Sequence, residues 1–286
     1  MIYCKELKQE FETKDDLFKA LAENENLIVD AKKAQIYKSI DKGLQIVTDQ
    51  KGIEKALTSE ENKGLKFDDN YYYFVVNSSN ILDSHNDMHV DGNWKKTVKE
   101  QQGKVYLVFD HTLKRSEIIA MQKDIEMLTA KIPFSLLGKN YDGESYCLIY
   151  KVAKDKIVNK EAKQWLEDGH KLEASVRMQY VNIETAFNTN DKEYAKQKEN
   201  YDMYYPMIAN KEEFEEIKYF WIEKEKKTPL WLTSIYKQKL KLISLTLFLT
   251  FLFLVLYKYQ VLLSKLRYKR TILLSITLFF IGWYAQ

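Results

Sequence analysis

Cysteine is scarce in this sequence, and its scarcity narrows the class of protein. Only Cys4 and Cys147 occur among the 286 residues, and their separation is not the ligand spacing of a zinc site. Two cysteines could pair with each other, but they cannot build the dense disulfide framework of a small secreted domain. The count favours a reduced protein of the cytosol.

The sequence also lacks a strong excess of positive over negative charge, or the reverse. The 44 lysines and arginines nearly balance the 41 aspartates and glutamates, which leaves a formal net charge of +3. No basic block with interleaved aromatic residues marks a nucleic-acid surface, and no internal repeat is present. We expect neither a nucleic-acid partner nor a cofactor.

Two long apolar runs occur, and both lie near the end of the sequence. Residues 242–257 and 271–285 contain no charged residue. Each run is shorter than the roughly 20 residues that cross a bilayer comfortably, yet both are too apolar for an ordinary surface helix. We therefore expect two apolar helices within 240–286 that attach the chain to a membrane.

The origin of this tail has two explanations. The basic residues between the two runs place that loop in the cytoplasm by the positive-inside rule, which would put the rest of the chain outside, although no signal peptide precedes it. Alternatively, a reading-frame shift after about residue 222 produced the tail. That event would explain its abrupt enrichment in leucine, phenylalanine, isoleucine, lysine and tyrosine.

The remainder of the sequence predicts both helices and strands. Residues 1–60 are charged and read as a helical region, in which Thr13 and Asp16 resemble a capping box. The run YYYFVV at 71–76 predicts a strand. Three further helices are predicted: over 160–168 with an end at Gly169, over 191–207 with an end near Pro206, and over 211–217.

A candidate nucleophile, Ser175, stands in the segment LEASVRMQYVNI at 172–183. Apolar and polar residues alternate there, which predicts a half-buried strand with Ser175 and Arg177 on the polar face. A serine on a rigid strand can act as a nucleophile if a base lies beside it. A merely solvated serine is the plainer alternative.

A candidate base, His111, follows the apolar run VYLVF at 105–109. The run predicts a buried strand that delivers Asp110 and His111 at its end. Neutral histidine is the side chain best suited to take a proton from serine at neutral pH. Among the four histidines, only His111 directly follows a strong apolar strand.

The segment DSHNDMHVDG at 83–92 carries a third concentration of polar residues. Its acidic and imidazole side chains alternate along the sequence: Asp83, His85, Asp87, His89 and Asp91. Such residues could bind a divalent metal. The alternative is that they shape a turn before Trp94, or supply a replacement base.

Several stretches of the sequence resemble the prohead proteases of tailed bacteriophages, which mature viral capsids. The resemblance covers about residues 1–225 and excludes the apolar tail. It rests on the order of these segments: MIYCKEL, ETKDDLFKAL, DDNYYYFVVNSSNILDSHNDMHVDGNW, VKEQQGKVYLVFDH, IPFSLLGKNYDG, EASVRMQYVNIE and IANKEEFEEIKYFW.

The resemblance implies an α+β fold, in which a β-barrel serine protease core of the herpesvirus-assemblin type occupies 65–235, with flanking helices. Ser175 matches the nucleophile and His111 the general base. Glu225 matches a glutamate of the segment that supplies the orienting acid, but Leu230 falls near the expected acidic position. Substitutes are Glu223 and Asp110, and Arg177 is a candidate for binding the substrate carbonyl or the oxyanion.

The implied function is a serine endopeptidase that cleaves the phage scaffold and major capsid proteins, and itself. It would act in the cytoplasm of an infected or lysogenic bacterium, inside the prohead, as a monomer or homo-oligomer. If the tail is genuine, residues 242–257 and 271–285 would add a membrane attachment. The alternatives are a catalytically degenerate prophage remnant and a membrane-anchored binding protein.

Overall fold

The computed structural model of the chain describes residues 1–38, 46–48, 50–109, 111–170, 172–174 and 176–228. They form an α+β arrangement that belongs to one compact unit. Six α-helices occur in this part of the chain: α1 (Lys14–Glu23), α2 (Glu25–Ala34), α3 (Gln50–Leu57), α4 (Lys95–Gln101), α5 (Lys160–Glu167) and α6 (Ala195–Tyr204).

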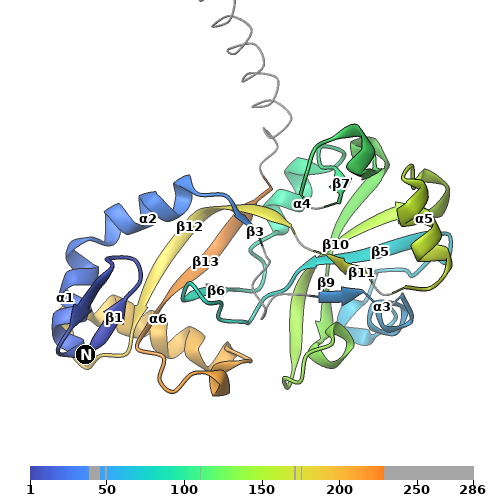
Figure 1. Cartoon of the computed structure of the whole chain (residues 1–286). Helices are drawn as coiled ribbons and strands as arrows, with labels where there is room; N and C mark the ends of the chain where they lie inside the picture. The colour runs from blue at the N-terminus through green and yellow to red at the C-terminus, as the bar shows by residue number, and fades with distance from the viewer. Residues whose placement is uncertain (39–45, 49, 110, 171, 175, 229–286) are drawn as a thin grey trace, which may run out of the picture. The chain divides into compact units, whose positions relative to one another are not determined.

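The strands of the described residues form several small sheets (Figure 1). The largest has the order β3 (Tyr37–Lys38), β12 (Arg177–Phe187), β13 (Tyr219–Lys227) and β6 (Asp87–His89). The next joins β5 (Tyr71–Asn77), β10 (Glu144–Ala153) and β9 (Ile125–Pro133). Three two-stranded sheets complete the set: β1 (Ile2–Cys4) with β2 (Gln9–Phe11), β11 (Leu172–Ala174) with β4 (Ile46–Thr48), and β7 (Leu107–Val108) with β8 (Ile118–Ala120). Within these described ranges no sheet closes into a barrel.

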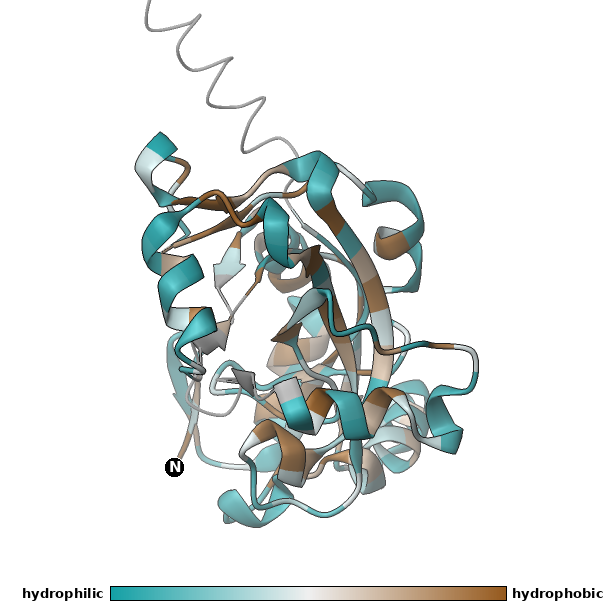
Figure 2. Cartoon of the chain, turned by 90° about the vertical axis from the view of Figure 1, so that its right-hand side faces the viewer, coloured by the Kyte–Doolittle hydropathy of each residue, from teal (hydrophilic) through white to brown (hydrophobic). Residues whose placement is uncertain are grey.

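The three-stranded sheet carries much of the apolar core. Strand β5 lies at one edge, and its residues from Tyr72 onward are buried. Tyr73, Val75 and Ile149 pack with Ile53 and Leu57 of α3 in one cluster. Figure 2 shows apolar residues gathered on the inner strands, while hydrophilic residues cover much of the outer helices and loops. The expected strand at 71–76 is confirmed.

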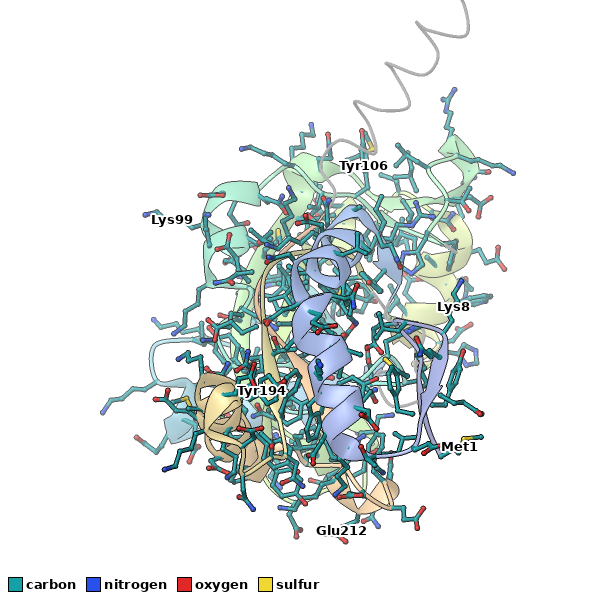
Figure 3. All side chains as sticks on the ribbon, turned by 90° about the vertical axis from the view of Figure 1, so that its left-hand side faces the viewer. Met1, Lys8, Lys99, Tyr106, Tyr194 and Glu212 are labelled. Atoms are coloured by element: carbon teal, nitrogen blue, oxygen red, sulfur yellow. The ribbon has the colours of Figure 1, made fainter. Side chains whose placement is uncertain are left out.

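The four-stranded sheet combines antiparallel and parallel pairing. Strand β12 pairs antiparallel with β13, whereas the three residues of β6 pair parallel with Trp221, Ile222 and Glu223 of β13. Helices α2 and α6 both contact β12. Charged side chains of both signs, including Lys8, Lys99 and Glu212, point outward from this side of the molecule (Figure 3).

The N-terminal region is less helical than its composition predicts. The hairpin of β1 and β2 precedes α1, and the short strands β3 and β4 follow α2. The capping prediction is confirmed, because Oγ1 of Thr13 accepts the backbone N–H of Asp16 at 3.1 Å. Leu17 and Leu21 of the same helix are fully buried.

Three sequence predictions need correction. The strand expected at 105–109 is shorter in the structure, because only Leu107 and Val108 pair with β8. These two residues form β7, and both are half-buried. The strand expected at 172–183 is two strands with different partners, since β11 pairs with β4 and β12 with β13 and β3. The helix expected at 211–217 is a single 3-10 turn at Lys211–Glu213.

Two helix predictions are confirmed in substance. Helix α5 ends as expected: Gly169 has a φ of +73°, and the N–H of His170 donates to the carbonyl of Trp165 at 2.9 Å. The polar segment 191–207 contains α6, and a 3-10 turn that includes Pro206 follows it.

The predicted apolar helices of 240–286 lie outside the described residues. Among the described residues, no helix is long and apolar enough to cross a membrane.

Candidate functional site

The candidate nucleophile, Ser175, lies outside the described residues, but both of its neighbours are described. Ala174 ends β11, and Val176 is buried immediately before β12. From Val176 to Tyr180 buried residues alternate with half-buried ones, as the sequence predicted for this face. Arg177 is half-buried, and its Nε makes no hydrogen bond to any described residue. The strands described on either side of Ser175 thus belong to two different sheets.

The candidate base, His111, occupies a tight turn after β7. Its φ is +53°, a left-handed conformation that is uncommon for residues other than glycine, although histidine adopts it more readily than most. The turn is closed by a hydrogen bond from the N–H of Thr112 to the carbonyl of Phe109 at 3.0 Å. Asp110 lies outside the described residues. His111 itself is half-buried.

Helix α5 joins the segments that carry these two candidates. The rings of Phe109 and Trp165 meet edge to face, with centroids 5.7 Å apart. Asn159, which caps α5, donates from Nδ2 to the carbonyl of Ser116 at 2.8 Å. Leu107, Phe109, Leu166 and Ala174 pack against the same apolar cluster. Residues that precede the turn of His111 and residues that precede Ser175 thus both border the main apolar cluster of the core.

The residue matched to the orienting acid has another partner. Oε1 of Glu225 lies 2.9 Å from Nζ of Lys96, and both side chains are partly exposed. Glu223, the first substitute, is fully buried in a different group of charges. The ion pair of Glu225 with Lys96 is a surface interaction of small energetic value.

The segment 83–92 makes a turn that leads into β6, in agreement with the prediction that its polar residues shape a turn. Oδ1 of Asp83 accepts the backbone N–H groups of His85 and Asp87 at 2.8 and 2.9 Å, and Asn86 has a φ of +57°. Among the residues that the structure describes, no three His, Cys, Asp or Glu side chains are arranged to hold a metal ion.

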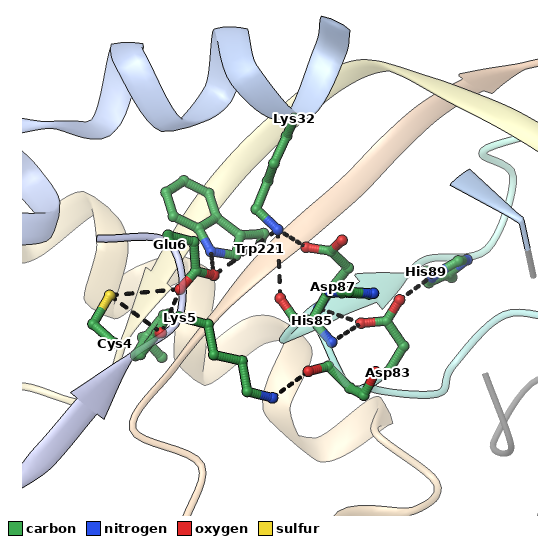
Figure 4. Close-up of polar contacts among 11 residues, drawn as sticks. Cys4, Lys5, Glu6, Lys32, Asp83, His85, Asp87, His89 and Trp221 are labelled. Carbon is green, nitrogen blue, oxygen red and sulfur yellow. Dashed lines mark hydrogen bonds and ion pairs between the residues drawn. The ribbon is translucent and has the colours of Figure 1, made fainter. Parts of the chain in front are cut away.

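Asp87 of this turn enters a buried group of charges drawn from four parts of the chain (Figure 4). Lys32 of α2 donates to Oδ1 of Asp87, and its Nζ lies 3.9 Å from Oε1 of Glu6. Glu6 in turn accepts from Nε1 of Trp221 at 2.6 Å and from the hydroxyl of Tyr219 at 2.7 Å. These contacts fasten α2 and the N-terminal hairpin to β6 and β13.

Further buried charged residues surround Lys226 on β13. Its Nζ contacts Nδ1 of His89, whose Nε2 lies 3.5 Å from Oδ2 of Asp83. Burial lowers the pKa of Lys226 to about 7, although Glu223, Asp83 and Asp87 act in the opposite direction. Burial and then the charge of Asp87 raise the pKa of Glu223 well above its ordinary value. Neither oxygen of Glu223 makes a hydrogen bond to a described residue.

The same loss of solvent acts on Asp87 and on its partner Lys32. Burial raises the pKa of Asp87 to about 6, with Lys32 opposing the shift. For Lys32, burial alone would lower the pKa, but the carboxylates of Asp87, Glu6 and Glu223 together outweigh it and the pKa is raised. We define the buried charge group by these members: Glu6, Lys32, Asp83, Asp87, His89, Glu223 and Lys226.

The buried charge group is a structural feature rather than a place for substrate. Asp87, His89, Glu223 and Lys226 have no exposed surface. Sequence analysis found Asp83, Asp87 and His89 through their spacing but missed Lys32 and Lys226, because single lysines in charged segments give no signal of burial. No protein-family model, no curated protein and no solved structure matches the chain.

Proposed function

We propose that the chain is a serine endopeptidase of the prohead type, with an assemblin-like core, Ser175 as nucleophile and His111 as general base. The ordered series of resembling segments supports this assignment. The observation that carries it furthest is the edge-to-face contact between Phe109 and Trp165, 5.7 Å between centroids. It joins the turn of His111 to the helix that precedes Ser175.

The conformation of His111 adds a second support. Left-handed backbone at a residue other than glycine costs free energy, and such strain is common at functional sites. Histidine tolerates this conformation better than β-branched residues do. His111 lies three residues after the end of β7 at Val108.

The proposed reaction is acyl transfer to serine. His111 accepts the proton of the Ser175 hydroxyl while Oγ attacks the carbonyl carbon of the scissile peptide bond. The C–N bond then breaks, and the departing amine takes the proton from His111. Water, deprotonated by the same imidazole, hydrolyses the ester and restores Ser175. Arg177 is proposed to bind the carbonyl oxygen as negative charge develops on it.

The proposed substrates are the scaffold and major capsid proteins of a phage, and the chain itself. The proposed setting is the prohead in the bacterial cytoplasm, with membrane attachment through 242–257 and 271–285 if those runs insert. The assignment of Ser175 and His111 does not depend on Glu225, whose carboxylate is paired with Lys96.

The first experiment is labelling of the full chain with a fluorophosphonate, which phosphonylates serines activated by a neighbouring base. The adduct is located by peptide mass spectrometry. We expect modification at Ser175 in the native chain and none in Ser175→Ala. His111→Asn should also block labelling while keeping the turn, because asparagine accepts a left-handed φ. Ser116→Ala, at an exposed serine, is the matched control and should label like the native chain.

Cleavage is tested by co-expressing the full chain with candidate scaffold and major capsid proteins and measuring intact masses. Products that require both Ser175 and His111 would establish an endopeptidase. Intact partners together with an unlabelled Ser175 in a folded chain would reject it. The pairing of Glu225 with Lys96 favours one alternative in that case, a degenerate prophage remnant that keeps the fold for binding capsid or scaffold protein.

A further inference from the structure

Three Asp–Gly pairs occur in the sequence, at 91–92, 142–143 and 168–169. This dipeptide is chemically special, because glycine has no Cβ to shield its backbone nitrogen, and that nitrogen can approach the carboxyl carbon of the preceding aspartate. The fold places the three pairs in different surroundings. The contacts of each carboxylate and of each glycine therefore decide which pair can react.

The pair Asp168–Gly169 is held by the end of α5. Asp168 has a helical ψ of −4°, and its Oδ1 accepts a hydrogen bond from Nε2 of Gln164 at 2.8 Å. The N–H of Gly169 donates to the carbonyl of Leu166 at 3.2 Å. Both reacting groups must leave these partners before they can meet.

The pair Asp91–Gly92 lies in a turn that is tied to the core. Oδ1 of Asp91 accepts the hydroxyl of Ser79, a fully buried residue, at 2.5 Å. The carbonyl of Gly92 accepts the N–H of Lys95 at 3.0 Å. The carboxylate must therefore give up its bond to Ser79 before it can turn freely toward the glycine nitrogen.

The pair Asp142–Gly143 lies in an exposed loop directly before β10. Neither the carboxylate of Asp142 nor the N–H of Gly143 makes a hydrogen bond within the described part of the chain. Gly143 has a φ of +86°, and beyond its chain neighbours no heavy atom lies within 4 Å of the place where a Cβ would stand. No contact therefore keeps the two reacting groups apart.

We propose that Asp142–Gly143 is a site of isoaspartate formation. The nitrogen of Gly143 attacks Cγ of the protonated Asp142 carboxyl group. The N–Cγ bond forms, the Cγ–O bond breaks, and the hydroxyl leaves with the amide proton as water. Water then opens the cyclic imide: opening at Cγ restores aspartate, whereas opening at the main-chain carbonyl of Asp142 leaves Gly143 joined through Cγ. The reaction needs no oxidant and uses no residue of the proposed protease site.

Asp142 stands between two contacts that fix its loop. On one side, the hydroxyl of Tyr141 donates to Oε1 of Glu213 at 2.5 Å, and on the other the carbonyl of Gly143 accepts the N–H of Phe134 at 3.2 Å. Isoaspartate inserts its β-carbon into the main chain between these contacts. We therefore expect the bond between Phe134 and Gly143, at the loop end of the β9–β10 hairpin, to weaken in the isomerised chain.

The experiment ages the full chain near neutral pH in water enriched in heavy oxygen and locates the label by peptide mass spectrometry. Each opening of the imide adds a heavy oxygen, whichever product forms. We expect label at Asp142 at a level at least about tenfold above that at Asp91 or Asp168, because opening a hydrogen bond to a charged group costs about that factor. An unlabelled Asp142, or equal labelling of all three, would overturn the proposal.

Two comparisons test whether the fold selects the site. Asp142→Glu keeps a carboxylate but requires a larger ring, so its label should disappear, whereas Asp155→Glu, at an exposed aspartate followed by lysine, should label at Asp142 like the native chain. In urea the hydrogen bonds of Asp91 and Asp168 are lost, and all three pairs should label to similar extents. A preference for Asp142 that persisted in urea would reject selection by the fold.

Hydrogen exchange at the amide of Phe134 measures the effect on the hairpin, because that N–H bonds the carbonyl of Gly143. We expect faster exchange in the aged native chain than in the fresh one. Asp142→Glu should show no change on ageing. A labelled Asp142 with unchanged exchange at Phe134 would reject the expected loss of this contact.

Discussion

Nζ of Lys226 on β13 contacts Nδ1 of His89 on β6, and both side chains are fully buried. An ammonium group has no acceptor, so a protonated Lys226 must donate to Nδ1. The imidazole is then neutral and carries its proton on Nε2, which faces Asp83 at 3.5 Å. The contact consequently fixes the histidine tautomer while Lys226 is protonated, which is the case below a pH of about 7.

Replacement of Lys226 by methionine should change the pH dependence of stability. An unfolded lysine titrates near 10.4, whereas burial lowers the pKa of Lys226 to about 7 in the folded chain. Between these values the unfolded state binds more protons, so this residue makes stability rise with pH from about 7 to about 10. The contribution is at most about 1.4 kcal/mol per pH unit.

Urea denaturation of the full chain at pH 7 and pH 9 measures this difference. We expect the native chain to gain more stability over that interval than Lys226→Met. Lys224→Met is the matched control, since Lys224 is partly exposed on the same strand and its pKa is raised. Equal gains in the native chain and Lys226→Met would show that Lys226 does not titrate in this range.

Replacement of Asp87 by asparagine should strongly destabilise the fold. The change removes the nearest carboxylate from Lys32, whose side chain is only 8% exposed. Breaking a buried pair from one side typically costs about 3–5 kcal/mol, whereas an exposed pair is worth about 0–1 kcal/mol. Lys32→Met combined with Asp87→Leu should recover much of the loss, because neither charge of the pair then remains buried.

Thermal unfolding of the full chain provides the comparison. Lys96→Met removes one partner of the exposed pair with Glu225 and serves as the control. A loss in Asp87→Asn no larger than that in Lys96→Met would argue against a tight pair between Asp87 and Lys32.

The sequence predicted those elements whose signals are local. The capping box at Thr13, the apolar strand at 71–76 and the glycine after α5 each specify structure through neighbouring residues. The run at 105–109 was misleading because apolar character does not say which residues will find a pairing partner. The strand at 172–183 divides near Ser175 because its two parts pair with different strands.

The buried charge group could not have been assembled from the sequence. Its members come from residues 6, 32, 83–89 and 223–226, and only the fold brings them together. The alternating pattern at 83–92 marked a polar turn but gave no indication of Lys32 or Lys226 as partners. Likewise, no local pattern relates Trp165 to Phe109.

Removal of the side-chain amide of Asn159 should loosen α5 at its start. Oδ1 of Asn159 accepts the N–H of Ala162 at 3.0 Å, and Nδ2 donates to Ser116. We expect Asn159→Ala to lose about 1–2 kcal/mol, because both the cap and the tertiary hydrogen bond disappear. Asn159→Asp keeps a capping oxygen but cannot donate to Ser116.

Urea denaturation and hydrogen exchange distinguish these two contributions. Thr13→Ala removes the cap of α1 and should cost about 1 kcal/mol without affecting exchange near His111. Faster exchange at Thr112 is expected in both Asn159 variants. If Asn159→Asp instead exchanged like the native chain, the bond to Ser116 would have no part in holding the turn.

Replacement of Glu225 by glutamine tests the third catalytic position. An acid that orients the histidine of a serine protease is worth about 10⁴-fold in rate. Glu225 is engaged with Lys96 at 2.9 Å on a partly exposed surface, so we expect Glu225→Gln to label with fluorophosphonate within about tenfold of the native rate. Lys96→Met is the companion variant, since it releases Glu225 from its ion pair. A loss near 10⁴-fold in Glu225→Gln, with native labelling in Lys96→Met, would instead assign Glu225 as the orienting acid and require its carboxylate to leave Lys96 in the active chain.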